Sequence, residues 1–397
     1  MSKENNKDIN LTTTNAGLKI YDDLWNKYDL PNIFDSIAPK HSGAPTSKIM
    51  QNLFFRNFMD ANSMAALSEK DKEEYFLKKN ASLHRTSYGR KLERLNDMQR
   101  KSILLKFNSN FITQQEIDED TIMVYDTSAI KAEGETYEEN DWTYDSCEDK
   151  MIMGYALNKL LLRTKNKVGT IDFELQNKDK DKTIGMFKGG RRQYGVNKIV
   201  IDAGPDLIGM DFYKKLDNEG FLFYTKAVKR WYFNYGKDYT VEQLRKLIKK
   251  RLQREGMVSL EVWKDDMLLR LVFVLNDKRV YLTNDLEIAA GKAVRYYDWR
   301  WNIETSFKEE KQNLGLETLP SRKLNGIKTH ILLVLLGYAL SQLILAKRIV
   351  KKITEGIKLI KRKIVKVFAF IVEKFGVMKF EFKPDYKYWW VFGLEFG

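Results

Sequence analysis

One segment of the sequence, YYDWRWNIETSFKEEKQNLGL, combines a carboxylate, a tyrosine and several cations at helical spacing. With about 100° of rotation per residue, five polar side chains fall within an arc of roughly 80°, and apolar residues fill the neighbouring arc. The five are Tyr297, Arg300, Glu304, Lys308 and Lys311. A solvated helix with ion pairs four residues apart would explain these charges alone. It would not explain the acidic residues found upstream.

Two aspartates are expected at the ends of strands, where active sites of open α/β sheets form. Asp126 follows an apolar run in TIMVYDTSAI, and Asp202 follows another in KIVIDAG. A lone aspartate at such a position is commonly a cap or a turn residue. Together with Glu304, however, the two would form a cluster of like charges that divalent cations hold together.

Oxygen ligands of this kind suit Mg²⁺ or Mn²⁺. Two such ions about 4 Å apart can clamp the attacking and leaving oxygens of a phosphodiester displacement. The sequence therefore predicts a metal site formed by Asp126, Asp202 and Glu304. The tyrosine and cations of the same helix would hold a DNA backbone against it.

The overall charge agrees with a polyanionic partner. The 397 residues include 68 Lys and Arg against 54 Asp and Glu, a net charge of +14, which favours nucleic acid. The single cysteine, Cys147, indicates a reducing compartment. The N-terminus is polar and lacks the apolar segment of a secretory signal. The apolar run from Ile331 to Ala346 is shorter than a membrane span and predicts a buried helix instead. We expect a cytoplasmic protein associated with the nucleoid.

The spacing of apolar residues changes along the chain. Helical spacing dominates the first part, and β-type runs alternate with helices after the acidic stretch QQEIDED. The predicted division is a disordered tail over 1–12, a helical DNA-binding region over 13–111, a catalytic core over 120–346 with a β-rich insertion at about 221–285, and a basic helix with an aromatic tail over 347–397.

The combined pattern resembles the DDE transposases of bacterial and archaeal insertion sequences, in particular the group with a Tyr-x2-Arg-x3-Glu-x6-Lys signature. Here the signature consists of Tyr297, Arg300, Glu304 and Lys311, with every spacing intact. Asp126 and Asp202 match the family's two aspartates, and the resemblance runs from about Ile122 to Leu345. One departure is Pro205, where relatives more often carry an aromatic or small residue.

The resemblance implies a ribonuclease H-like α/β core with a β-rich insertion, preceded by an all-helical region. It implies an enzyme that cleaves DNA at transposon ends and joins the freed 3′-hydroxyl to target DNA. Asp126 would bridge two Mg²⁺ ions, with Mn²⁺ as a substitute, and Asp202 and Glu304 would each complete one ion's shell. Relatives recognise terminal inverted repeats and act as a homodimer that synapses the two ends.

Two other functions are compatible with the same core. One is a structure-selective nuclease that does not join strands. The other is a domesticated or decayed DNA-binding protein without catalysis. The intact set of three carboxylates and the intact signature argue against decay.

Overall fold

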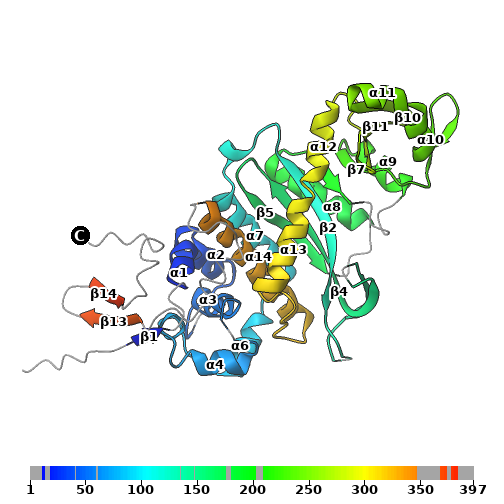
Figure 1. Ribbon diagram of the computed structural model, residues 1–397. Coiled ribbons are helices and arrows are strands. Elements are labelled where there is room, and N and C mark those ends of the chain that lie inside the picture. The colour runs from blue at the N-terminus through cyan, green and yellow to red at the C-terminus, as the bar shows by residue number, and fades with distance from the viewer. Residues whose placement is uncertain are drawn as a thin grey trace, which may run out of the picture. The chain divides into compact units, whose positions relative to one another are not determined.

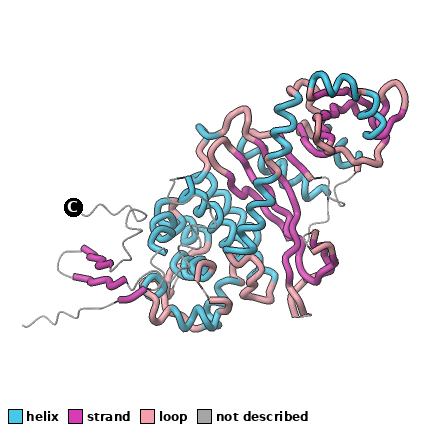
Figure 2. The backbone as a smooth tube through the Cα atoms, viewed as in Figure 1, coloured by secondary structure: helices cyan, strands magenta, loops and turns pink. Residues whose placement is uncertain are grey.

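The computed structural model describes residues 11–13, 18–40, 42–59, 61–134, 136–146, 148–175, 180–202, 209–346, 367–372 and 377–382 (Figures 1 and 2). The chain divides into two compact units. The helical unit comprises Met1–Phe111, Lys131–Asp141 and Lys308–Gly397, and the sheet unit comprises Ile112–Ile130 and Trp142–Phe307.

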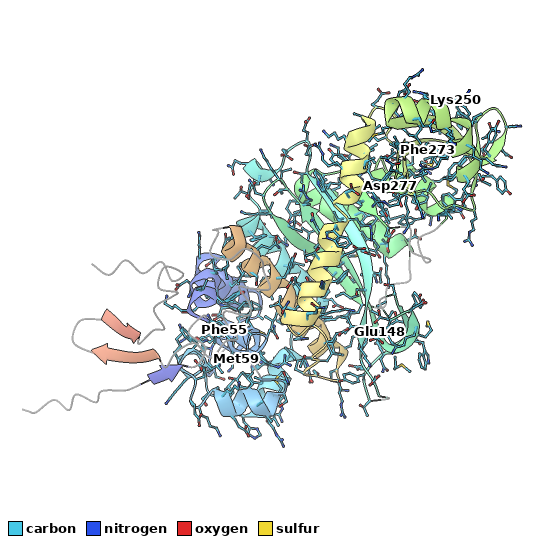
Figure 3. All side chains as sticks on the ribbon, viewed as in Figure 1. Phe55, Met59, Glu148, Lys250, Phe273 and Asp277 are labelled. Carbon is cyan, nitrogen blue, oxygen red and sulfur yellow. The ribbon has the colours of Figure 1, made fainter. Side chains whose placement is uncertain are left out.

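The first 111 residues contribute a bundle of short helices to the helical unit. Trp25 stacks on Phe34 of the next helix with ring centroids 5.4 Å apart, and it also packs against Phe54 of a third helix with centroids 4.9 Å apart. Phe55 and Met59 belong to the same core and are almost completely buried (Figure 3). These contacts arise because apolar residues recur three and four positions apart. The helices are α1 (Leu18–Lys27), α2 (Leu30–Ile37), α3 (Thr46–Arg56), α4 (Met64–Lys70), α5 (Tyr75–Lys78), α6 (Arg85–Leu92) and α7 (Asp97–Phe111).

Helix α14 (Leu324–Ala346) is the apolar centre of the helical unit. It contacts α3, α6 and α7. The stretch Leu324–Ile344 is long and apolar enough to cross a membrane, yet 83% of its most apolar window is buried within the protein. His330 is buried there too, and its Nε2 donates to the Gly315 carbonyl at 3.0 Å. The prediction of a buried helix is confirmed.

In the helical unit, a buried carboxylate at the end of α4 binds residues of the segment that leads into α6 and of α6 itself. Asp71 is completely buried. It accepts hydrogen bonds from the Ser82 hydroxyl at 2.9 Å, the Leu83 N–H at 2.8 Å and the Tyr88 hydroxyl at 2.8 Å. The side-chain amide of Asn52 donates to the same tyrosine oxygen at 2.9 Å. These donors offset the cost of removing a carboxylate from water.

The described part of the sheet unit is built on an eleven-stranded sheet with the order β3-β4-β2-β6-β7-β12-β11-β10-β8-β9, in which β5 also pairs with β4. The strands on the core side are β2 (Ile122–Lys131), β3 (Asp141–Asp145), β4 (Lys150–Arg163), β5 (Val168–Leu175), β6 (Lys198–Ile201) and β7 (Leu222–Lys226). Helix α8 (Lys180–Tyr194) precedes β6, and α9 (Met210–Asn218) connects β6 to β7.

The order of these strands gives the core its fold. The β4–β5 hairpin is antiparallel, whereas β2, β6 and β7 run parallel. Parallel strands require crossover connections, which α8 and α9 supply. This mixed sheet, preceded in the chain by α1–α7, confirms the predicted ribonuclease H-like core behind an all-helical region.

The sequence Gly189-Gly190-Arg191-Arg192 is typical of a basic loop, but in the structure it is helical. It lies within α8. An added Cβ at Gly190 would stand 2.6 Å from Met123 Sδ and 3.0 Å from Ile171 Cδ1. Gly190 therefore allows α8 to approach β2 and β5 more closely than a side chain would permit. Helical glycines of this kind mimic a loop signal in the sequence.

The β-rich insertion leaves the core after β7 and returns through β12. Its strands pair antiparallel, and left-handed residues at Asp265, Asp266 and Asn276 form the two tight turns predicted from sequence. Phe273 is fully buried in the insertion, and Lys250 is exposed on its helical side (Figure 3). The elements are β8 (Tyr232–Asn234), β9 (Asp238–Thr240), α10 (Val241–Leu247), α11 (Lys249–Glu255), β10 (Met257–Lys264), β11 (Met267–Val274) and β12 (Val280–Thr283).

Several expectations fall partly or wholly outside the described residues. The predicted basic helix over Lys347–Lys366 lies outside them, as do Pro205 and residues 1–10 of the predicted disordered tail. The short strand β1 (Leu11–Thr13) pairs with β13 (Val367–Val372), which pairs in turn with β14 (Val377–Phe382).

Candidate active site

The site forms across three parallel strands of the sheet unit, beside the ends of β6 and β7. Tyr125 of β2 pairs with Ile201 of β6, so the next residues, Asp126 and Asp202, are neighbours across the two strands. The register between β6 and β7 pairs Val200 with Tyr224. Continuing it by two residues places Lys226 beside Asp202. Asp126 lies inside β2 rather than at its end, a correction that arises because β2 is longer than its parallel neighbour.

The segment that carries Glu304 is two helices rather than the single helix expected. Helix α12 (Ala290–Asp298) ends and α13 (Trp301–Asn313) begins with a tight turn between them. In that turn the N–H of Arg300 bonds to the Tyr297 carbonyl at 2.9 Å, three residues back. Because such 3₁₀-type bonds keep the backbone nearly helical, the polar stripe survives the interruption.

The carboxylates of Asp126, Asp202 and Glu304 surround one guanidinium nitrogen. Arg300 Nη1 lies 2.6 Å from Glu304 Oε1, 3.0 Å from Asp202 Oδ2 and 3.8 Å from Asp126 Oδ2. The four residues come from β2, the end of β6, and the α12–α13 segment. The structure therefore brings the three predicted carboxylates together around a cation from the same predicted stripe.

Asp202 is the most heavily bonded member of this cluster. The Tyr297 hydroxyl donates to Asp202 Oδ1 at 3.3 Å, and Lys226 Nζ forms an ion pair with the same oxygen at 3.0 Å. The Tyr297 ring packs edge-on against Tyr281 with centroids 5.4 Å apart. Sequence reasoning missed Lys226. Its position at the end of the third parallel strand was the available signal.

Strand β4 holds α13 against the sheet and so positions Glu304. Lys159 is completely buried, and its Nζ donates to the Ser306 hydroxyl at 2.6 Å. Arg163 Nε donates to Asn302 Oδ1 at 2.9 Å. Its guanidinium also lies 3.6 Å from the centroid of the Trp299 ring, a cation–π contact.

Crowding of like charges perturbs the cluster. The pKa of Asp126 is raised to about 6, mainly by burial and in smaller part by the carboxylates of Asp202 and Glu304, against the opposing effects of the Thr127 N–H and Arg300. Burial also raises the pKa of Tyr297, with a contribution from Asp202, so this phenol stays protonated and can donate. Perturbed groups that converge in this way are typical of functional sites.

The remaining predicted residues of the stripe lie farther along α13, in the part assigned to the helical unit. Lys308 is exposed, and Lys311 forms an ion pair with Glu317 at 3.3 Å. Trp263 and Trp301, which their apolar character would place in the core, are 52% and 68% exposed. Apolar character alone did not predict burial, because Trp301 begins α13 on its outer side.

The cluster fits divalent cations in its ligand chemistry. Three carboxylates from separate elements provide the oxygen ligands that Mg²⁺ and Mn²⁺ prefer. Within the described residues, no three His, Cys, Asp or Glu side chains are arranged as they stand to hold a metal ion. The point that the three carboxylates share is taken by Arg300 Nη1.

Comparison with known proteins identifies the domain that carries this cluster. The family described as "Transposase DDE domain" matches residues 117–340. The chain belongs to the transposase DDE domain family. The matched range of this DDE domain contains Asp126, Asp202 and Glu304 together with the whole insertion.

Among solved structures, the chain is similar to a structure described as the "Drosophila P element transposase strand transfer complex", with a TM-score of 0.27 and 14% sequence identity. That similarity covers 60% of this chain and 56% of the other. A search of curated protein sequences gave no match.

Proposed function

We propose that this protein is a DNA transposase of the insertion-sequence group with the Tyr-x2-Arg-x3-Glu-x6-Lys signature. It would cleave DNA at transposon ends and transfer the freed 3′-hydroxyl into target DNA. The observation that supports this proposal is the convergence of Asp126, Asp202 and Glu304 on a single cation within a transposase DDE domain.

In this proposal the three carboxylates hold two Mg²⁺ ions, or Mn²⁺ in their place. When bound, the ions supply Lewis-acid stabilisation of the attacking and leaving oxygens at phosphorus. As the resemblance implies, Asp126 would serve both ions, and Asp202 and Glu304 would serve one each. The raised pKa of Asp126, about 6, still leaves the carboxylate mostly ionised at neutral pH and available as a ligand.

The cations and the phenol position the DNA. Tyr297, Arg300, Lys308 and Lys311 would contact phosphates near the cleaved strand. Arginine and lysine contacts of this kind fix the register of a backbone without reading its sequence. The helical region over 13–111 would bind the terminal inverted repeats, and two copies of the chain would bring both ends together. Such a protein acts at the nucleoid in the cytoplasm.

The test is cleavage of DNA that carries the element's own flanks. Purified full-length protein is incubated with this DNA and Mg²⁺, and the cut ends and joined products are mapped at nucleotide resolution. We expect cuts at the boundaries of short inverted repeats and joining to a target plasmid. Glu304→Ala serves as the matched inactive control.

The products also discriminate the alternatives. Cleavage without joining would identify a nuclease in place of a transposase. DNA binding without any cleavage, in Mg²⁺ and in Mn²⁺, would contradict an enzymatic role and favour a DNA-binding protein. Normal cleavage by Glu304→Ala would contradict the assignment of the three carboxylates.

A further inference from the structure

Arg300 lies where a bound cation would be expected. A single nitrogen, Nη1, is 2.6 Å from Glu304 Oε1 and 3.0 Å from Asp202 Oδ2. Its two protons satisfy these two carboxylates, and the third carboxylate, from Asp126, is 3.8 Å away. One positive charge thus serves as the shared counter-ion of three negative ones.

We propose that Arg300 is a stand-in cation: it occupies the carboxylate cluster of the DNA-free protein and has to leave before divalent metal ions can bind there. The exchange makes metal loading depend on a second partner for Arg300. A DNA phosphate is such a partner, since guanidinium groups bind phosphate at least as readily as carboxylate. This step rests on the proposed function, because it takes the arriving ligand to be DNA.

The position of Arg300 is held by charge rather than by a complete set of hydrogen bonds. Its Nε is buried, and the described residues provide no hydrogen-bond acceptor for it. A buried N–H without a partner costs free energy. This cost suits a position that is vacated when another ligand arrives.

Lys226 provides an internal comparison. Its ammonium pairs with Asp202 Oδ1 at 3.0 Å, on the oxygen that Arg300 does not contact. Of the three carboxylates, Lys226 forms an ion pair with Asp202, whereas Arg300 forms ion pairs with all three. A cation that neutralises a single carboxylate competes less strongly with a metal ion than one that lies between all three.

The experiment measures Mn²⁺ binding to DNA-free, full-length protein by electron paramagnetic resonance. We compare the wild type with Arg300→Ala, Arg300→Gln, Lys226→Ala and Arg295→Ala. Arg295 is the matched control because it lies on the neighbouring helix α12 and pairs with Asp120 at 3.7 Å, away from the cluster. Removing Arg300 should strengthen Mn²⁺ binding by at least about tenfold. Lys226→Ala should strengthen it less, and Arg295→Ala should leave it unchanged.

A second substitution locates the bound ion. Adding Glu304→Gln to Arg300→Ala should abolish the gain in Mn²⁺ affinity. A gain that persisted would place the ion elsewhere and overturn the proposal. If Arg300→Ala does not fold, Arg300→Gln, which keeps most of the side-chain volume, decides the question.

Unchanged or weaker Mn²⁺ binding by the folded Arg300 variants would overturn the proposal, as would a larger gain from Lys226→Ala. These results are independent of DNA cleavage. A wild-type protein that fails to cleave, but whose Arg300 variants gain Mn²⁺ affinity, would contradict the proposed function alone. Normal cleavage combined with unchanged Mn²⁺ affinity in the variants would contradict the exchange alone.

Discussion

Two carboxylates of this protein, Asp71 and Asp126, have opposite surroundings. Asp71, in the helical unit, is completely buried and accepts three hydrogen bonds from a hydroxyl, a backbone N–H and a phenol. Asp126, in the sheet unit, accepts one from the Thr127 N–H at 2.8 Å and faces two other carboxylates. The first arrangement stabilises a fold. The second keeps three carboxylates that repel one another close together, with Arg300 as their shared counter-ion.

The comparison teaches how to tell a structural acid from a functional one. Burial alone does not separate them clearly, since the Asp71 side chain is fully buried and that of Asp126 is only 23% exposed. The neighbours do: donors surround Asp71, whereas Asp126 shares its space with Asp202 and Glu304. Sites built for chemistry often give up stability in this way.

The largest expected effect tests the functional side of this comparison. Asp126→Asn should reduce Mg²⁺-dependent DNA cleavage by at least about a thousandfold, equivalent to roughly 4 kcal/mol, because an amide cannot replace an ionised metal ligand. Initial rates on labelled transposon-end DNA measure it. DNA binding, followed by gel shift, should be retained. Substantial residual cleavage would contradict a ligand role for Asp126.

The next effect concerns stability, which should fall when Asp71 is replaced and rise when Asp126 is replaced. Asp71→Ala should lower the free energy of unfolding by about 3 kcal/mol, because it removes the charged acceptor of three hydrogen bonds, one of them from the buried Tyr88. Asp126→Asn should instead raise it by roughly 1–2 kcal/mol at pH 7.5 in EDTA, since it removes a repelled charge. Urea unfolding of both variants measures the difference. Equal losses of stability would remove the distinction between the two sites.

Acid should destabilise the helical unit through a third buried group. The pKa of His330 is lowered to about 3, mainly by burial and in smaller part by the charge of Arg56. Between pH 6.5 and 3 the unfolded chain therefore binds a proton that the folded chain does not, so stability falls as the pH falls. Relative to His330→Gln, the wild type should lose about 1.4 kcal/mol per pH unit below pH 6. Unfolding curves at pH 7.5, 6 and 5 check this, and parallel profiles would contradict it.

The smallest effect tests the outer part of the stripe. Lys311→Ala should weaken binding to transposon ends and reduce the slope of log affinity against log salt by about one. Fluorescence anisotropy between 50 and 300 mM salt measures the slope. Glu317→Gln is the control, because it breaks the ion pair with Lys311 while keeping the cation. A similar change in slope from both variants would assign Lys311 a structural role only.

Much of this arrangement could be predicted from sequence because its signals are local. Apolar runs that end in Asp126 and Asp202 mark strands, and the spacing from Tyr297 to Lys311 marks a helical stripe. The helix break before Trp301 could not be predicted, because a few 3₁₀-type bonds leave no strong sequence signal. Lys226 was missed for a different reason: its partner is set by strand register, which a single strand does not reveal. The helical position of Gly190 likewise could not be predicted, because it depends on packing against β2, which is distant in the sequence.

The return of the insertion through β12 has a further consequence. Thr283 of β12 pairs with Tyr224 of β7, and Tyr281 pairs with Lys226, so the chain leaves and rejoins the core at points about 5 Å apart. The insertion is therefore a branch of the core whose two ends lie on adjacent, paired strands. Its length and content can change over evolution without altering the spacing of the acidic side chains, because that spacing is fixed by strand pairing in the core. The core and the branch are free to diversify at different rates.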